Sequence, residues 1–181
     1  MTAAAAGGPR DWDAAIIVMG VAGAGKSTIA ERLAQRLHRK LVEGDTLHPP
    51  ANVEKMSRGI PLGDADRMPW LQAIAARIDA ARKAKQPIVV TCSALKRAYR
   101  ATLAGGKDDV GFVYLKGPKD LIARRLAARK NHFMPAQLLD SQFAALQEPG
   151  ADEAAITVTI DPPPDEIVDR IVAMFMPRQP A

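Results

Sequence analysis

The sequence predicts an α/β fold in three layers, with a five-stranded parallel sheet between two layers of helices. Two observations lead to this prediction. Short apolar runs alternate along the chain with segments whose apolar residues recur at helical spacing. The runs are apolar throughout rather than at every second position, which is typical of strands covered on both faces. Strands separated by helices join in parallel through right-handed crossovers, and 181 residues suit one such domain.

The first part of the chain alternates strand and helix twice. Residues 1–13 contain an alanine run and a Gly-Gly-Pro sequence, and we expect them to form a flexible tail. Residues 14–19 are uniformly apolar and predict a strand, and apolar residues then keep helical spacing over 27–37. A short strand at 40–43 ends at a Gly-Asp pair. Residues 50–58 predict a helix, which the following Gly-Ile-Pro sequence breaks.

The middle of the chain continues this order. A helix begins around 64–69, where acidic residues and a proline suit a first turn, and an apolar stripe at helical spacing follows. Residues 87–92 and 110–115 predict two further buried strands. Residues 94–103 predict the helix between them.

The last part adds two helices, a strand and a closing helix. The helices are expected at 119–129 and 135–146, and their apolar residues recur at three or four positions. A fifth strand is expected at 156–160 and a last helix at 165–174. Because neither a repeat nor a long linker interrupts this order, residues 14–181 are expected to form a single domain.

Composition limits the possible functions. The net charge is +5, but arginine and lysine are spread along helices, so a nucleic-acid partner is not indicated. Cys92 is the only cysteine, which excludes a disulfide within the chain and a cysteine metal site. No apolar run approaches the ~18 residues of a membrane span. We therefore expect a cytoplasmic protein that does not bind membranes.

The most informative motif follows the first expected strand. Residues 20–27 read Gly-Val-Ala-Gly-Ala-Gly-Lys-Ser, which is the G-x-x-x-x-G-K-[ST] pattern of a phosphate-binding loop between a strand and a helix. Its glycines allow backbone N–H groups to converge on phosphate oxygens, and Lys26 supplies a positive charge for the β- and γ-phosphates. The predicted ATP-binding residues of this loop are Gly20, Val21, Ala22, Gly23, Ala24, Gly25, Lys26, Ser27 and Thr28.

Two carboxylates follow the second expected strand. Glu43 and Asp45 are two residues apart, so in an extended chain both side chains would point the same way. If this strand end lies beside the phosphate loop, one carboxylate could hold Mg²⁺ through water while the other meets an acceptor hydroxyl. Ser27 and Glu43 are the candidate Mg²⁺ residues, and Lys26 and Asp45 are candidate catalytic residues. Two exposed turn acids are the alternative interpretation.

Other residues favour a small-molecule kinase. The chain lacks the Asn-Lys-x-Asp sequence of GTPases, and the strand at 87–92 does not end in the acidic residue of motor ATPases. Arg125 and Arg129 are four residues apart and share a helix face, which suits stabilisation of a transferring phosphate. A solvated basic helix face is the alternative. We expect the segment around 125–140 to form a small helical lid that excludes water.

Several motifs in the right order together resemble the gluconokinases. The resemblance covers about residues 14–175, and its distinctive blocks are Cys-Ser-Ala-Leu-Lys at 92–96 and His-Phe-Met-Pro at 132–135. The other matching blocks are 20–27, Glu-Gly-Asp-Thr-Leu-His-Pro at 43–49, 52–56, 59–62, 64–71, 97–100 and 141–149. It implies a P-loop kinase fold shared with shikimate and adenylate kinases, and transfer of the ATP γ-phosphate to the 6-hydroxyl of D-gluconate with Mg²⁺. It also implies a homodimer.

The resemblance implies roles for individual residues. Asp45 is the candidate base, and Arg125 and Arg129 are the arginines that contact adenine and phosphate, so Arg129 is also a candidate catalytic residue. The candidate substrate-binding residues are Asp45, His48, Arg67, Lys96, Arg100 and His132. For His48 and His132, hydrogen bonding within the protein is the favoured interpretation.

The sequence departs from the family pattern at two positions and leaves two rival functions. Glu43 stands where Asp is expected, and Asn131 stands where Gly is usual. One rival is another kinase of the same fold, such as a shikimate kinase. The other is a nucleotide-binding regulator or an RNA-end-processing protein, for which steep salt dependence of RNA binding would be diagnostic.

Overall fold

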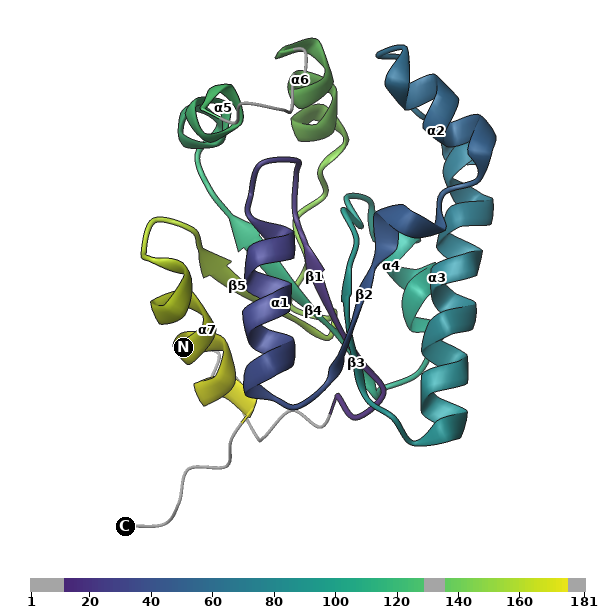
Figure 1. Cartoon of the computed structure of the whole chain (residues 1–181), viewed down its shortest axis with the longest axis vertical. Helices are drawn as coiled ribbons and strands as arrows, with labels where there is room; N and C mark the ends of the chain where they lie inside the picture. The colour runs from purple at the N-terminus through teal and green to yellow at the C-terminus, as the bar shows by residue number, and fades with distance from the viewer. Residues whose placement is uncertain (1–11, 129–135, 176–181) are drawn as a thin grey trace.

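The computed structural model describes residues 12–128 and 136–175. Its five parallel strands lie in the order β2-β3-β1-β4-β5 (Figure 1). The strands are β1 (Ala15–Met19), β2 (Lys40–Glu43), β3 (Ile88–Thr91), β4 (Val110–Lys116) and β5 (Ala155–Thr159). The helices are α1 (Lys26–Arg36), α2 (Pro50–Ser57), α3 (Asp64–Ala84), α4 (Arg97–Ala104), α5 (Lys119–Ala127), α6 (Ala136–Ala145) and α7 (Pro164–Phe175). This confirms the predicted α/β fold.

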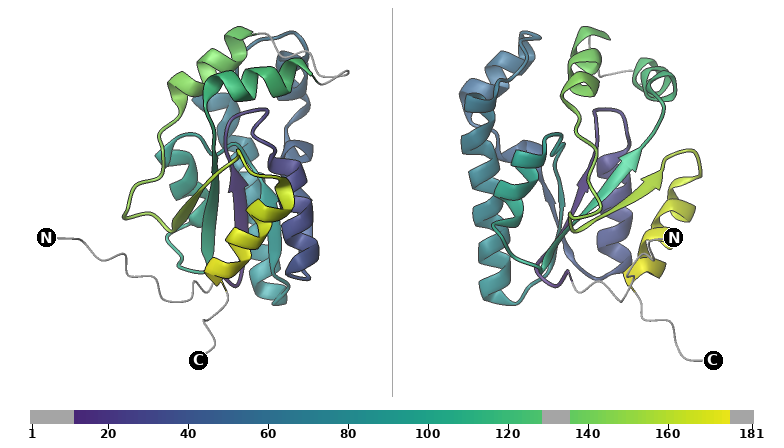
Figure 2. Two further views of the ribbon diagram at one scale, coloured as in Figure 1. Left: turned by 90° about the vertical axis from the view of Figure 1, so that its left-hand side faces the viewer. Right: turned by 180° about the vertical axis from the view of Figure 1, so that it is seen from behind.

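Helices cover both faces of the sheet (Figures 1 and 2). One core cluster packs α1 and α7 against the sheet through residues such as Leu33 and Ile171. The other packs α3 and α4 against the opposite face through residues such as Trp70 and Leu103. The central strands are buried on both faces, which explains their continuous apolar sequences.

The carboxyl ends of all five strands meet at one edge because the sheet is parallel. The phosphate loop follows β1, a 3-10 helix (Gly44–Leu47) follows β2, and residues 92–96 follow β3. Helices α2, α5 and α6 lie beyond this edge (Figure 1). The topology therefore collects the chemically interesting loops at one end of the molecule.

The structure corrects the sequence predictions at two places. The tail was expected to include residue 13, but Trp12 is 4% exposed and packs edge-on against Phe175. Its indole lies against Gly111, where a Cβ atom would come within 1.7 Å of the ring. Trp12 therefore belongs to the folded domain rather than to a tail. The helix expected at 94–103 begins only at Arg97, because Ala94 has a φ of +44° and ends any regular structure.

Candidate active site

The phosphate loop has the backbone conformation that its glycines allow. Gly23 has a φ of +82°, and a Cβ atom there would lie 2.6 Å from Leu126 of α5. Gly25 has a φ of +94° and directly precedes α1, so the first turn of that helix faces the loop. The ammonium of Lys26 donates to the carbonyl of Val21 at 3.1 Å. The Lys26 side chain thus folds back onto its own loop, and the loop carries backbone amides of the kind that bind phosphate oxygens.

Two neighbouring segments hold this loop in place. The amide of Gly20 donates to the carbonyl of Ser93 at 3.3 Å, which links the loop to the end of β3. The amide of Ala22 donates to the side-chain oxygen of Gln142 in α6 at 2.7 Å. Phosphate oxygens bind such loop amides in P-loop proteins. Gln142 therefore accepts a hydrogen bond from a loop amide that could otherwise bind a nucleotide phosphate. The sequence had not indicated this residue.

A carboxylate and two hydroxyls meet where β2 and β3 end. Glu43 and Thr91 are paired in the sheet register, and the Thr91 hydroxyl donates to Glu43 Oε2 at 2.6 Å. The Ser27 hydroxyl donates to the same oxygen at 3.2 Å. The predicted pair of Ser27 and Glu43 is thereby brought together. The sequence did not identify Thr91 as a site residue. The signal that could have identified it is its position at the end of a strand, next to the strand that ends in Glu43.

This donor set fits a magnesium ion. Mg²⁺ prefers oxygen ligands, keeps several waters and takes few ligands from the protein beside substrate phosphates. The Ser27 hydroxyl on the phosphate loop and the neighbouring Glu43 carboxylate at the end of β2 supply such ligands. Among residues 12–128 and 136–175, no cluster of three or more His, Cys, Asp or Glu side chains could hold a metal alone. The site therefore suits a metal that arrives with a nucleotide.

Gly44 explains the sharp bend after Glu43. A Cβ atom at Gly44 would lie 2.0 Å from the carbonyl oxygen of Thr91, so only glycine fits here. Its amide donates to the Thr91 hydroxyl at 3.1 Å, and its carbonyl accepts from the indole of Trp70 at 2.8 Å. The chain then enters the 3-10 helix, so Glu43 and Asp45 do not lie on one extended strand. The expectation that extended geometry aligns them is wrong.

Asp45 lies beside an oriented histidine. The His48 ring stacks on Trp70 with centroids 4.1 Å apart, and its side chain is 4% exposed. The buried Asn52 amide nitrogen donates to the carbonyl of Asp66 at 2.8 Å and lies 3.4 Å from His48 Nδ1. Because that nitrogen can only donate, Nδ1 accepts and the proton sits on Nε2, which faces Asp45 Oδ1 at 3.9 Å. Burial lowers the pKa of His48, which keeps the ring neutral.

A cavity of about 530 Å³ joins these groups. Lys26, Asp45, His48 and Arg67 line it, and α6 contributes one wall. A second cavity of about 330 Å³ shares Arg67 with the first and extends to Lys96. Together with Ala22 of the phosphate loop, five of the predicted site residues therefore line one cavity, and a sixth, Lys96, lies in the adjoining one.

Lys96 is held by a carboxylate in the second cavity. Its ammonium donates to both oxygens of Asp64, at 2.7 and 3.0 Å, and the Tyr99 hydroxyl donates to the same group. The hydrogen bond from Lys96 lowers the pKa of Asp64 below its usual range. Asp64 therefore holds the Lys96 ammonium in the lining of this cavity.

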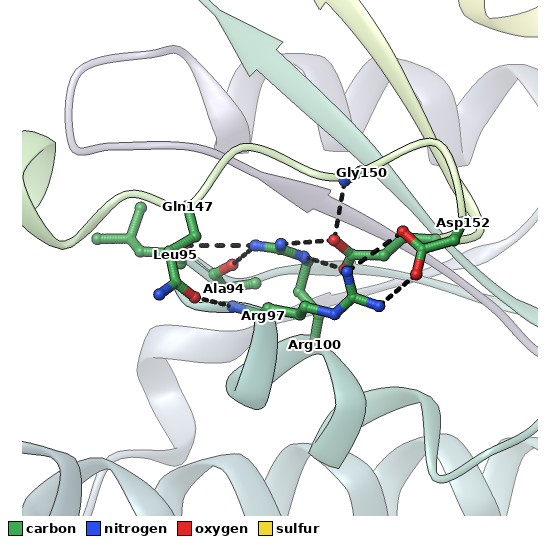
Figure 3. Close-up of polar contacts among 8 residues, drawn as sticks. Ala94, Leu95, Arg97, Arg100, Gln147, Gly150 and Asp152 are labelled. Carbon is green, nitrogen blue, oxygen red and sulfur yellow. Dashed lines mark hydrogen bonds and ion pairs between the residues drawn. The ribbon is translucent and has the colours of Figure 1, made fainter.

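The structure does not support Arg100 as a substrate ligand. Its side chain is 1% exposed and lines neither cavity. Its guanidinium donates to both oxygens of Glu153, at 2.6 and 2.8 Å, and to the carbonyls of Ala94 and Leu95 (Figure 3). All of these partners belong to the protein, so we correct the prediction and assign Arg100 a role inside the fold.

The remaining predicted residues fall near or outside the described part of the chain. Arg125 donates to the carbonyl of Ile160 at 2.8 Å, which places it beside the segment between β5 and α7. Arg129, Asn131, His132 and the middle of the expected lid lie outside the described residues. Their roles stay predictions.

The single cysteine lies outside the cavities. Cys92 is 1% exposed, and burial raises the pKa of its thiol to about 12, so it behaves as a small apolar residue. In the described part of the chain, no helix has the length and apolar character needed to cross a membrane.

Sequence comparison connects this site with known proteins. A family model described as an AAA domain matches residues 16–149. The thermoresistant gluconokinase of Escherichia coli (strain K12) is 47% identical over 153 residues, which are 84% of this chain and 87% of that protein. The gluconokinase of Gluconobacter oxydans (strain 621H) is 48% identical over 160 residues, which are 88% of this chain and 90% of that protein.

Solved structures agree with the sequence comparison. A gluconokinase from Sinorhizobium meliloti 1021 superposes with a TM-score of 0.84 and 42% identity, covering 92% of this chain and 93% of that one. A shikimate kinase from Aquifex aeolicus vf5 has a TM-score of 0.57 but 17% identity, so that likeness concerns the fold alone. Nearly half of the aligned residues are identical over most of both chains in the two curated relatives. The chain belongs to the gluconokinase family.

Proposed function

We propose that this protein transfers the γ-phosphate of ATP to the 6-hydroxyl of D-gluconate and releases 6-phospho-D-gluconate and ADP. The observation that carries this proposal is the shared cavity. A phosphate-loop lysine, Lys26, and an exposed carboxylate, Asp45, line the same space of about 530 Å³. Membership of the gluconokinase family supports gluconate as the acceptor.

The nucleotide half of the site consists of the phosphate loop and its lysine. Backbone amides of residues 20–27 would bind phosphate oxygens, and the Lys26 ammonium would stabilise the charge that develops on the transferring group. Arg125 lies against the carbonyl of Ile160, where the chain leaves β5. That location supports a contact with the nucleotide base, with Arg129 as the phosphate-contacting partner by family resemblance.

Ser27 and Glu43 would hold the magnesium ion of the nucleotide. When bound, Mg²⁺ neutralises the phosphate oxygens and orients the γ-phosphate. Thr91 keeps the Glu43 carboxylate turned toward Ser27, since its hydroxyl donates to the same oxygen at 2.6 Å. Glu43 is one methylene longer than the aspartate expected of the family, and Mg²⁺ in proteins usually keeps several water ligands.

The acceptor half centres on Asp45. Its carboxylate would accept the proton of the 6-hydroxyl as the hydroxyl oxygen bonds to the γ-phosphorus. The bond from that phosphorus to the bridging oxygen breaks, and ADP leaves with those electrons. The Nε2 atom of the neutral His48 ring faces Asp45 Oδ1 at 3.9 Å, which is longer than a hydrogen bond, and places an N–H group beside the carboxylate. Arg67 and Lys96 line the adjoining cavity and supply positive charge for the gluconate carboxylate.

A substrate panel tests the proposal. ADP formation is measured with D-gluconate, other sugar acids, shikimate and nucleoside monophosphates, each with and without Mg²⁺. We expect Mg²⁺-dependent turnover with D-gluconate that exceeds every other acceptor. Faster turnover with shikimate or a nucleotide would reassign the acceptor within the same fold, and salt-sensitive RNA binding without turnover would refute kinase activity.

Two finer expectations accompany this function. The family resemblance implies a homodimer, which light scattering of the purified protein would test. A reaction that consumes ATP is expected in the cytoplasm, and fluorescence of a tagged chain would test that location.

A further inference from the structure

The loop after β3 is held by a buried ion pair. Residues 92–96, which we name the acceptor loop, place Ser93 in the larger cavity and Lys96 in the smaller one. We propose that Arg100 and Glu153 form a positioning pair, which holds the acceptor loop in the conformation that binds the sugar acid. This inference rests on the proposed function and concerns residues that do not touch the substrate.

The pair reaches the acceptor loop through its carbonyl groups. Arg100 Nη1 donates to the carbonyls of Ala94 and Leu95 at 3.0 and 3.3 Å. Its Nε and Nη2 donate to the two oxygens of Glu153, whose side chain is 12% exposed (Figure 3). One guanidinium therefore connects the loop to a carboxylate that lies 53 residues further along the chain. A planar donor fork is needed for this, because a single ammonium lacks that geometry.

The acceptor loop needs such a restraint. Ala94 is fully buried and has a φ of +44°, a left-handed conformation that costs a non-glycine residue free energy. Left alone, the loop would relax toward ordinary backbone angles. Relaxation would move Ser93 and Lys96, which flank this residue on either side. The Arg100 hydrogen bond to the Ala94 carbonyl opposes that change.

The same network joins two walls of the cavities. The Gln147 amide donates to the Leu95 carbonyl, and the Gln147 side-chain oxygen accepts from the Arg97 amide, both at 2.8 Å (Figure 3). The Gly150 amide donates to Glu153 at 2.9 Å. Residues 147–153 follow α6, whose Gln142 lines both cavities. The pair thus fixes the distance between the acceptor loop and the wall formed by α6.

Stability alone is a poor explanation for these charges. Burying two ions requires removing their water, and apolar residues of similar volume often stabilise a fold equally well. Apolar residues cannot donate hydrogen bonds to the Ala94 and Leu95 carbonyls. The hydrogen bond from Arg100 lowers the pKa of Glu153, so the carboxylate stays charged at neutral pH. Replacing both partners with apolar residues therefore removes the hydrogen bonds to the loop while leaving no unpaired buried charge, so an effect on loop position can be distinguished from an effect on stability.

The test compares two double variants. Arg100→Leu with Glu153→Leu removes the buried pair without leaving a lone charge. Arg97→Gln with Asp152→Asn removes the neighbouring exposed pair and serves as the matched control. Steady-state kinetics give the KM for gluconate and for ATP, and thermal unfolding by circular dichroism reports folding. Hydrogen exchange of the Arg97 and Gln147 amides reports the loop directly, without substrate.

We expect the buried-pair variant to fold, to raise the gluconate KM at least about tenfold and to leave the ATP KM within about twofold. The Arg97 and Gln147 amides should exchange at least about tenfold faster, while the control variant matches the parent. An unchanged gluconate KM in a folded variant overturns the proposal, and so does an equal rise of both KM values. If the variant does not fold, Arg100→Lys replaces it. We then expect the gluconate KM to rise at least about threefold, and an unchanged gluconate KM overturns the proposal.

Failure of the proposed function gives a different result. In that case the parent protein itself does not consume ATP with gluconate. The exchange rates of the two amides still decide whether the pair holds the loop.

Discussion

Thr91→Val is the substitution that most sharply connects the fold with metal binding. The Thr91 hydroxyl donates to Glu43 Oε2 at 2.6 Å and accepts from the Gly44 amide at 3.1 Å. Valine keeps the branched shape of the 3% exposed side chain but removes both hydrogen bonds. The change therefore tests the hydroxyl with little effect on packing.

The expected loss of stability follows from the two hydrogen bonds. A hydrogen bond to a charged group contributes about 1.5–3 kcal/mol, and a buried amide without an acceptor costs about 1–3 kcal/mol. The additional methyl group recovers about 0.8 kcal/mol. Because Glu43 keeps its contact with Ser27, the lower halves of these ranges apply, and we expect a net loss of about 2–3 kcal/mol. For a domain of this size that lowers the melting temperature by roughly 5–10 °C.

Urea unfolding and Mg²⁺ titration of the initial rate measure the two effects. The carboxylate of Glu43 loses one of its two restraints, so half-maximal activity should need several-fold more Mg²⁺. Thr91→Ser keeps the hydroxyl and is the control, with a normal Mg²⁺ requirement and a loss of about 1 kcal/mol for the missing methyl group. Stability within about 0.5 kcal/mol of the parent and an unchanged Mg²⁺ requirement in Thr91→Val would show that the hydroxyl neither stabilises this bend nor restrains Glu43.

Three further predictions concern the cavity. Lys26→Ala should lower kcat by several orders of magnitude while the melting temperature changes little, because the side chain serves the transferring phosphate; near-normal turnover would contradict this. Asp45→Asn should lower kcat at least about 100-fold while the Kd for ATP, measured by calorimetry, hardly changes; a collapse of ATP affinity would move Asp45 to the metal site. Burial lowers the pKa of His48 in the folded protein. Below pH 6.5 the unfolded chain therefore binds more protons than the folded one. The free energy of unfolding should fall as the pH drops from 6.5 toward the pKa of the folded state. His48→Gln should flatten that profile, and equal profiles in the parent and in His48→Gln would contradict the assignment.

Much of the fold could be predicted because buried parallel strands are continuous apolar runs. The strand predictions agree with the structure within one residue, since these runs end where the chain leaves the core. Trp12 was missed because a single aromatic residue after an alanine- and glycine-rich stretch has no periodicity. Its burial depends on Gly111, which lies far along the sequence and leaves room for the ring.

The site was harder to predict wherever a side chain has a distant partner. The phosphate loop is a local motif, and so its position and turn followed from spacing. Arg100 is one of many basic residues, and only contact with Glu153 distinguishes a buried structural arginine from a ligand-binding one. Glu43 contacts Ser27, and Asp45 lines a cavity with Lys26, but the close approach of Gly44 to Thr91 bends the chain between the two carboxylates. Such contacts depend on the register of β2 and β3, which local sequence does not encode.

The position of the phosphate on the product distinguishes transfer to the 6-hydroxyl from every other reaction. The protein is incubated with ATP, Mg²⁺ and uniformly ¹³C-labelled D-gluconate, and the product is examined by ¹³C and ³¹P NMR. Transfer to the 6-hydroxyl gives one phosphorylated product, whose phosphorus couples to C6 and C5 of the sugar acid. Coupling to any other carbon, or unchanged gluconate while ATP is hydrolysed, would contradict it.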